Sequence, residues 1–166
     1  NSDLVGSYKA LTKYKNHEEA TNLLKRIASQ VKPIMKSHSW RVGRLEEFNP
    51  TDPRLLGVNV DYGSIIKIRL RRPGNENSFI DFESLVGTML HELTHIIHGP
   101  HDAKFYSLLD KLHSEYYVLL ARGYSGDGFF SKPYSLSAGA SHNVSYHEAR
   151  GKMLEAAEKR VGIRGI

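Results

Sequence analysis

The sequence predicts one α+β domain, in which a small, mostly antiparallel sheet packs on a helix that carries a His-Glu-x-x-His motif, with further helices around it. Three observations support this class. The 166 residues match the size of a single domain with a substantial core. Segments with helical apolar spacing flank a middle region in which apolar residues alternate as in strands. No repeat or linker divides the chain, so we assign residues 1–166 to one domain.

The composition limits the classes of function. Hydrophobic residues make up 40% and charged residues 25% of the chain, which is typical of a globular domain. No apolar run is long enough to span a membrane, so no membrane partner is expected. The absence of cysteine excludes disulfides, thiolate-bound zinc and thiol catalysis. The net charge of +5 favours a polyanionic partner, although a solvated basic surface explains it equally well.

The first helix is expected after an irregular lead-in over residues 1–15. Asn16 and Glu19 form a capping pattern, and Pro33 is expected to end or bend the helix after about four turns. The apolar stripe of this helix consists of Ala20, Leu23, Leu24, Ile27, Ala28 and Val31. Its outer side and end carry Lys25, Arg26, Lys32 and Lys36. For these four cations we favour a solvated face over a contact with nucleic acid.

The middle region predicts a strand over residues 39–48 and then a hairpin, with strands near 56–60 and 66–70. In the second hairpin strand, the face opposite the aliphatic residues carries cations. These cations are Lys67, Arg69 and Arg71, with Arg72 just beyond. They could contact a DNA backbone, or they could protect an edge strand from aggregation.

The motif His91-Glu92-Leu93-Thr94-His95 carries the chemistry of the chain. On a helix, His91 and His95 lie one turn apart, about 6 Å along the axis and on one face. This placement suits two imidazoles on one Zn²⁺ ion at about 2.1 Å each. Glu92 lies beside them and can reach the open coordination position, where it could act as a general base.

The residues on either side of the motif are expected to cap the helix, to end it and to supply the third zinc ligand. Asp81 can cap the helix, and Gly99 before Pro100 is expected to end it, with Gly99 in the left-handed conformation. The chain then turns, and His101 can fold back as the third ligand. His98 is the alternative, but its rise of about 10 Å from His91 is too long. A buried helix that carries histidines by chance is the remaining structural alternative.

The last third of the chain predicts two more helices separated by a loop. Asp102 can cap a helix that Gly123 closes. Tyr106 lies off its apolar stripe, so the hydroxyl could support the site, although simple packing is the commoner role. Residues 124–144 are rich in glycine and serine and are expected to form an irregular flap or loop. A capping box then opens a helix over residues 145–161.

Several separated blocks of the chain occur in the order found in one family. They are Pro33-Ile34-Met35-Lys36, Arg41-Val42-Gly43, Arg54-Leu55-Leu56-Gly57, the run over residues 87–95, and Gly99-Pro100-His101-Asp102 with Lys104-Phe105-Tyr106. Together they resemble the WLM domain, the catalytic domain of fungal DNA–protein crosslink repair proteases, which are similar to the animal Spartan proteases. The resemblance runs from about Glu18 to Leu120.

This resemblance implies a zincin-like fold, with zinc ligands at His91, His95 and His101 and a catalytic base at Glu92. It implies DNA-stimulated, zinc-dependent cleavage of proteins bound or crosslinked to DNA, with single-stranded or damaged DNA as partner. The expected location is the nucleus, with the cytoplasm as a second one. The family's segments that bind SUMO and a segregase ATPase are not recognisable in this chain. The turn glycine follows one position later than in the common metzincin pattern, and no Met-turn can be assigned.

The residues leave two other functions open. One is a DNA- or protein-binding module with a structural zinc, which would need a fourth ligand, and nearby sequence offers only His98 as an easy candidate. The other is a general metallopeptidase unrelated to DNA, which DNA-dependence of cleavage would distinguish. In a protease, the second donor that stabilises the oxyanion has two candidates, Tyr106 and His98.

Overall fold

The computed structural model describes residues 4–126 and 129–130. In chain order the elements are β1 (Val5–Lys9), α1 (His17–His38), β2 (Val42–Phe48), β3 (Gly57–Val60), β4 (Ile65–Arg69), β5 (Arg71–Arg72), β6 (Asn75–Phe79), α2 (Phe82–Thr94), α3 (Ala103–Ala121), β7 (Tyr124–Gly126) and β8 (Phe129–Phe130). The helix predicted over residues 145–161 and most of the predicted flap lie outside the described residues.

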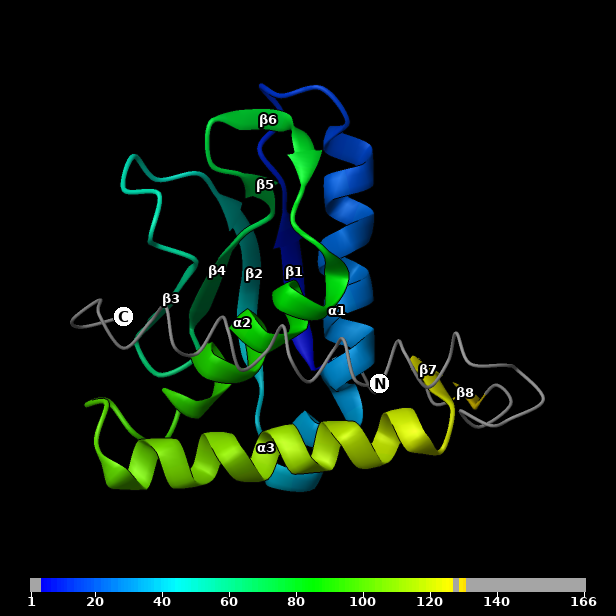
Figure 1. The fold of residues 1–166 in the computed structure, drawn as a ribbon, viewed down its shortest axis with the longest axis vertical. Helices are drawn as coiled ribbons and strands as arrows, with labels where there is room; N and C mark the ends of the chain where they lie inside the picture. Colours follow the sequence, from blue (N-terminus) through cyan, green and yellow to red (C-terminus); the bar gives the residue numbers. More distant parts are fainter. Residues whose placement is uncertain (1–3, 127–128, 131–166) are drawn as a thin grey trace.

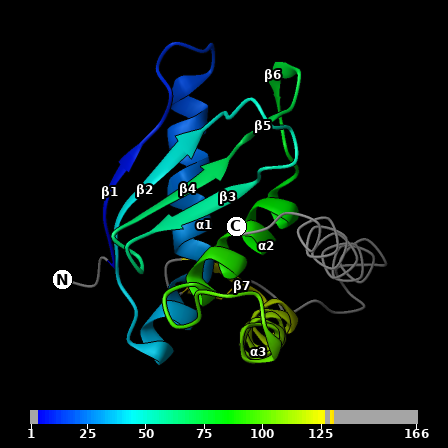
Figure 2. The same ribbon diagram turned by 90° about the vertical axis from the view of Figure 1, so that its left-hand side faces the viewer.

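Four strands form the main sheet, in the order β1-β2-β4-β3 (Figures 1 and 2). Strands β1 and β4 both run parallel to β2, and only β3 pairs antiparallel, with β4. The predicted hairpin of β3 and β4 is therefore confirmed, but the prediction of a mostly antiparallel sheet is wrong. The physical reason is that α1 connects β1 to β2 as a crossover, which makes these neighbours parallel.

Strand β1 corrects the prediction that residues 1–15 form an irregular lead-in. It lies at the edge of the sheet, and among its residues only Val5 is buried, so it lacks the apolar alternation that identifies a strand. Its backbone comes close to β2: a Cβ on Gly6 would lie 2.6 Å from the carbonyl oxygen of Gly43. Pairing with β2, rather than its own side chains, defines this strand.

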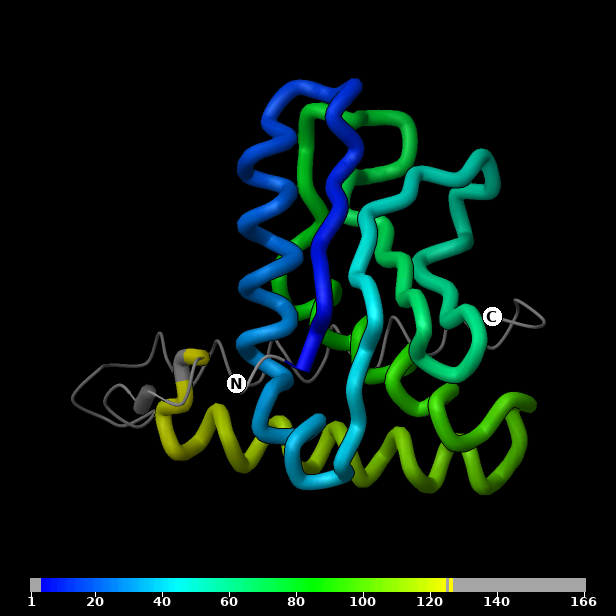
Figure 3. The backbone as a smooth tube through the Cα atoms, turned by 180° about the vertical axis from the view of Figure 1, so that it is seen from behind, coloured from blue at the N-terminus to red at the C-terminus, as the bar shows by residue number. Residues whose placement is uncertain are grey.

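Helix α1 lies alongside β1 and covers one face of the sheet (Figure 3). Of the two alternatives predicted for Pro33, an end of the helix is wrong, because the helix continues to His38 with Pro33 inside it. Proline lacks the N–H that would bond to the carbonyl of Ser29, and that carbonyl instead accepts a hydrogen bond from the Tyr124 hydroxyl at 2.8 Å. Asn16 is the N-cap residue as predicted, but it adopts a left-handed conformation without a side-chain cap.

Helices α2 and α3 complete the core, with α3 crossing the end of α1 and of the sheet (Figure 1). The predicted caps are confirmed, since Asp81 accepts from the Ser84 N–H and Asp102 from the Phe105 N–H. The fully buried side chains of the core include Leu24, Ile27, Val31, Leu45, Ile66, Ile68, Met89, Leu90, Leu93, Phe105, Leu112 and Tyr116. These residues come from the helices and from the sheet, and their packing fixes α2 between the sheet and α3.

Strands β7 and β8 form a short antiparallel pair at the start of the segment predicted as an irregular flap. This part of the prediction is wrong, because Tyr124 is buried against α1. Its carbonyl also accepts from the side-chain amide of Gln30. Among the helices that the structure describes, none is long and apolar enough to cross a membrane.

Candidate metal centre

Helix α2 carries the motif through the interior of the domain. Its residues from Leu85 to Thr94 are all buried, because the sheet covers one side and α3 the other. His91 is only 2% exposed and Glu92 is fully buried. The two polar side chains are therefore held in a protein environment rather than in bulk water.

The end of α2 differs from the prediction. The helix ends at Thr94, with His95 as the C-cap residue, so Gly99 does not provide the stop. The N–H of His98 bonds to the Thr94 carbonyl, and the carbonyl of His98 accepts from Nδ1 of His95 at 2.9 Å. A backbone carbonyl can only accept, so the Nδ1 of His95 carries the proton and Nε2 is left as the metal-binding nitrogen.

Three histidines converge at this helix end. His91 comes from α2, His95 from its C-cap and His101 from the loop before α3, and their ligand atoms all lie within 4.8 Å of one another. The Nε2 atoms of His95 and His101 are 3.0 Å apart. Three imidazoles that meet at one point form the donor set of a catalytic zinc site, which leaves one position for water or substrate. The residues present therefore fit a zinc ion.

Phe105 forms the floor of this cluster. The centroid of its ring lies 4.9 Å from that of His91, 4.6 Å from that of His95 and 4.8 Å from that of His101. Phe105 is fully buried in the first turn of α3, which Asp102 caps. The hydrogen bond from the Phe105 N–H holds the pKa of Asp102 below its usual value. The apolar period placed Phe105 in the core, but did not show that it contacts all three histidines.

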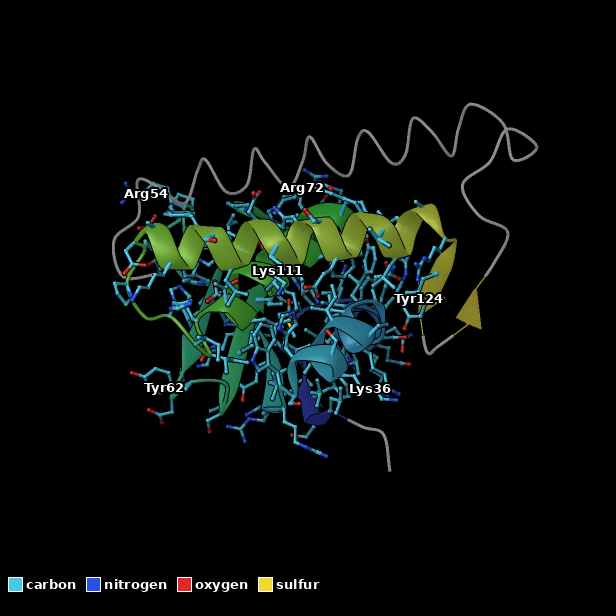
Figure 4. All side chains as sticks on the ribbon, turned by 90° about the horizontal axis from the view of Figure 1, so that it is seen from below. Lys36, Arg54, Tyr62, Arg72, Lys111 and Tyr124 are labelled. Carbon is cyan, nitrogen blue, oxygen red and sulfur yellow. The ribbon has the colours of Figure 1, made fainter. Side chains whose placement is uncertain are left out.

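Glu92 and His95 line a cleft of about 240 Å³. The other residues that line it are Val58, Asn59, Asp61, Tyr62 and Gly99. Most of them belong to β3, the edge strand of the sheet, and to the turn that follows it; Tyr62 extends outward from this turn (Figure 4). The cleft thus lies beside the histidine cluster, with Glu92 in its wall.

Two residues of β3 position this cleft, and sequence reasoning missed both. A Cβ on Gly57 would lie 2.9 Å from Oε2 of Glu92, so only glycine allows β3 to pass this close to the carboxylate. The side-chain amide of Asn59 donates to the Glu92 carbonyl at 2.7 Å and accepts from the Gly63 N–H at 2.7 Å. In the sequence, Gly57 stood out only as part of the block Arg54-Leu55-Leu56-Gly57, and no sequence pattern pointed to Asn59.

The basic strand differs from the prediction that it contacts DNA. Strand β4 is an interior strand, and Arg69, at 2% exposed, donates hydrogen bonds to the carbonyls of Leu55, Pro50 and Asp52 and to the side chain of Asn49. Burial lowers the pKa of its guanidinium. Arg69 therefore fixes the loop that leads into β3.

Arg71 is likewise internal. At 1% exposed, it pairs with the buried carboxylate of Glu47 at 2.7 Å and donates to the carbonyls of Lys15 and Glu76. The predicted DNA contacts of Arg69 and Arg71 are thus wrong, because both guanidinium groups are buried within the fold. Of the other two strand cations, Lys67 is half-buried, and Arg72 is exposed with a hydrogen bond to the Ser78 hydroxyl.

Tyr106 and His98 lie beside the histidine cluster without joining it. The Tyr106 ring packs edge-on against Phe105, and its centroid is 6.2 Å from that of His101. The side chain of His98 lines a separate cavity along α3 with Lys104, Ser107 and Lys111. Its backbone carbonyl, rather than its imidazole, is the group that contacts His95.

The family model of the WLM domain matches residues 3–164 of the chain. The chain belongs to the WLM family. It is 50% identical over 108 residues to the DNA-dependent metalloprotease WSS1 of Saccharomyces cerevisiae, a match that covers 65% of this chain and 40% of that protein. The DNA-dependent metalloprotease WSS1 homolog of Schizosaccharomyces pombe is 38% identical over 112 residues, or 68% of this chain and 42% of that one. The chain thus spans about two fifths of the length of these relatives.

The fold of this WLM chain is also that of solved structures. The crystal structure of Wss1 from S. cerevisiae matches with a TM-score of 0.72 and 45% identity, covering 74% of this chain and 96% of that one. The structure of Wss1 from S. pombe matches with a TM-score of 0.61 and 35% identity, covering 68% and 92%. The predicted α+β class, with a small sheet and helices packed on it, is therefore confirmed, and the described residues contain three of these helices.

Proposed function

We propose that this chain is a zinc-dependent endopeptidase that cleaves proteins bound or crosslinked to DNA and is stimulated by DNA, as part of DNA–protein crosslink repair in the nucleus. The observation that carries the proposal is the placement of Glu92 and His95 in one cleft, with His91 and His101 converging on His95. The names of the WSS1 relatives, which describe DNA-dependent metalloproteases, support the dependence on DNA. We attribute any binding of SUMO or a segregase ATPase to segments outside this chain.

The mechanism follows from the positions of the side chains. His91, His95 and His101 would hold the ion, and zinc bound by three imidazoles polarises a carbonyl and lowers the pKa of water. The carboxylate of Glu92 takes the proton from the attacking water and later transfers it to the leaving nitrogen of the peptide. Gly57 leaves room for this carboxylate, while Asn59 joins the edge strand to the backbone of Glu92. The substrate and the base are thereby held on elements fixed to one another.

Two alternatives have less support. A closed structural zinc site needs a fourth protein ligand, whereas the cluster in the described part of the chain contains three donors, with His98 directed elsewhere. A peptidase unrelated to DNA would share the same cleft. The names of the WSS1 relatives and the net charge of +5 favour the DNA-dependent enzyme.

The test is cleavage of a DNA-binding protein by the zinc-loaded chain, with and without single-stranded DNA, beside Glu92→Gln. Glu76→Gln is the matched control, because it makes the same change on an exposed residue of β6. We expect cleavage only with DNA, in the wild type and the control but not in Glu92→Gln. Cleavage that needs Glu92 but ignores DNA would leave the zinc chemistry and remove the link to DNA. Normal turnover by metal-loaded Glu92→Gln would contradict the enzyme mechanism.

A further inference from the structure

A groove of about 270 Å³ is lined by residues of β1 and α1, at the edge of the sheet opposite β3. Figure 3 shows β1 and α1 side by side. The residues that line it are Leu4, Val5, Tyr8, Lys25, Ala28, Ser29, Lys32 and Met35. They combine two cations, one aromatic ring, a hydroxyl and an apolar floor. Neither the fold nor the proposed catalysis accounts for this combination.

The cations of the groove lie in a row. Lys25 and Lys32 are seven residues apart on α1, which places them on the same side of the helix and about 10 Å apart along its axis. At this distance the two ammonium groups can contact different phosphates of one strand. Ser29 lies between the two lysines, and exposed Lys36 follows one turn later. The described residues that line the groove carry two ammonium groups and no carboxylate, so this part of the surface favours a chain of phosphates.

The aromatic ring adds a second kind of recognition. Tyr8 is half-buried on β1 and lines the same groove as the lysines, above the apolar side chains of Val5, Ala28 and Met35. Single-stranded nucleic acids bind where cations follow the backbone and aromatic rings stack on bases. A duplex, whose bases are already stacked, cannot use the ring of Tyr8 in this way.

We propose that the groove between β1 and α1 binds single-stranded DNA. This inference rests on the proposed function and gives the DNA a place that the buried Arg69 and Arg71 cannot provide. Three strand spacings of about 4.8 Å separate β1 from β3, so DNA in the groove lies roughly 15 Å from the cleft edge. The cleft stays free for the protein part of a DNA-bound substrate, and the shared DNA raises the effective concentration of that substrate.

The experiment measures binding of a fluorescent 12-nucleotide oligo(dT) to the whole chain between 50 and 200 mM salt. The double variant Lys25→Gln/Lys32→Gln should reduce the slope of log affinity against log salt by about 1.4, at about 0.7 for each lost phosphate contact. Tyr8→Leu should weaken binding about tenfold while leaving the slope unchanged. Thermal unfolding of each variant verifies that the fold is retained.

The matched control is Lys104→Gln/Lys111→Gln, which removes the same charge from exposed positions of α3 (Lys111, Figure 4). We expect wild-type binding from it. Equal loss in the control and the groove variant would overturn the proposal, as would an unchanged slope in the groove variant. Tighter binding of the same sequence as RNA, with the same loss of slope, would assign the groove to RNA instead.

These outcomes separate the groove from the proposed function. If the wild type binds DNA but the groove variant retains the full slope, only the location is wrong. If the wild type cleaves protein through Glu92 yet neither binds DNA nor responds to it, the link to DNA fails together with the groove.

Discussion

His95, at the C-cap of α2, and two arginines, Arg69 in β4 and Arg71 in β5, meet opposite environments. His95 lines an open cleft, where its Nε2 approaches that of His101. Arg69 and Arg71 are almost completely covered, and their guanidinium groups bind backbone carbonyls and the carboxylate of Glu47 in β2. One set of polar groups is available to a ligand, and the other is used within the fold.

The difference shows what makes a polar group available. At the end of α2 the backbone carbonyl of His98 binds Nδ1 of His95, and Nε2 of His95 faces His101. Beside β4, the loop over residues 49–55 covers the strand and brings unpaired carbonyls that need donors. A planar guanidinium with five donors satisfies several of them at once. Arg69 therefore stabilises the loop before β3, and Arg71 joins β2 to β6 and to the segment before α1.

The largest expected effect is on zinc binding by the three histidines. His101→Ala should reduce zinc affinity more than about a hundredfold, because it removes one of three donors. His98→Ala is the matched control and should retain zinc, since its contact with His95 uses the backbone carbonyl. Competition with a zinc chelator measures both. Loss of zinc in the His98 variant alone would reverse the assignment.

The next effect is on the stability that the buried arginine Arg71 provides. Arg71→Met should lower the free energy of unfolding by about 3–5 kcal/mol, because it leaves the buried carboxylate of Glu47 without its cation. Arg72→Gln, on the exposed neighbour, should change it by less than about 0.5 kcal/mol. Urea denaturation compares the two variants. Equal stability of both would indicate that Arg71 does not hold the fold together.

Gly57→Ala tests the contact between the edge strand and the base. The new Cβ would lie 2.8 Å from Cγ2 of Thr88 and 2.9 Å from Oε2 of Glu92, so β3 or the carboxylate must move. We expect a loss of about 1–3 kcal/mol in unfolding free energy and lower turnover. For stability, Gly99→Ala is the control, because nothing lies within 4 Å of its Cβ position. Wild-type turnover in Gly57→Ala would show that the close approach is dispensable.

Phe105→Leu tests the floor of the histidine cluster. Losing the ring that packs on all three imidazoles should weaken metal binding about tenfold, the lower range for residues that orient ligands. It should also change the visible spectrum of the cobalt-substituted protein. Tyr106→Phe, one residue along, should leave both unchanged, because its ring packs beside Phe105. An unaltered cobalt spectrum in Phe105→Leu would limit Phe105 to general packing.

The smallest effect is in the loop that Arg69 holds. The hydrogen bond and charge of Arg54 keep the pKa of the Asp52 carboxyl below its usual value. Because the folded-state pKa is lowered, this pairing stabilises the fold above the usual pKa and is lost as pH falls through the lowered one. In Arg54→Gln the pKa of Asp52 should rise toward about 3.9, which carboxyl NMR titration measures. An unchanged value would assign the shift to other groups.

The sequence alone determined the parts of this protein that depend on neighbours along the chain. The caps at Asp81 and Asp102, the helices that they open and the β3–β4 hairpin follow from local rules of spacing and capping. The motif placed His91 and His95 one turn apart, and the rise of a helix favoured His101 over His98. The resemblance to the WLM domain used the same local blocks, and the family match agrees with it.

Only the tertiary structure decided which faces are covered. Strand β1 exists because β2 pairs with it, and the sheet is mostly parallel because α1 crosses over. The loop over residues 49–55 buries Arg69, while Gly57, Asn59 and Phe105 acquire their roles from groups more than three residues away. Side-chain periodicity gives the direction of each residue on its own element. What lies in that direction depends on segments that are distant in sequence, whose packing no local pattern encodes.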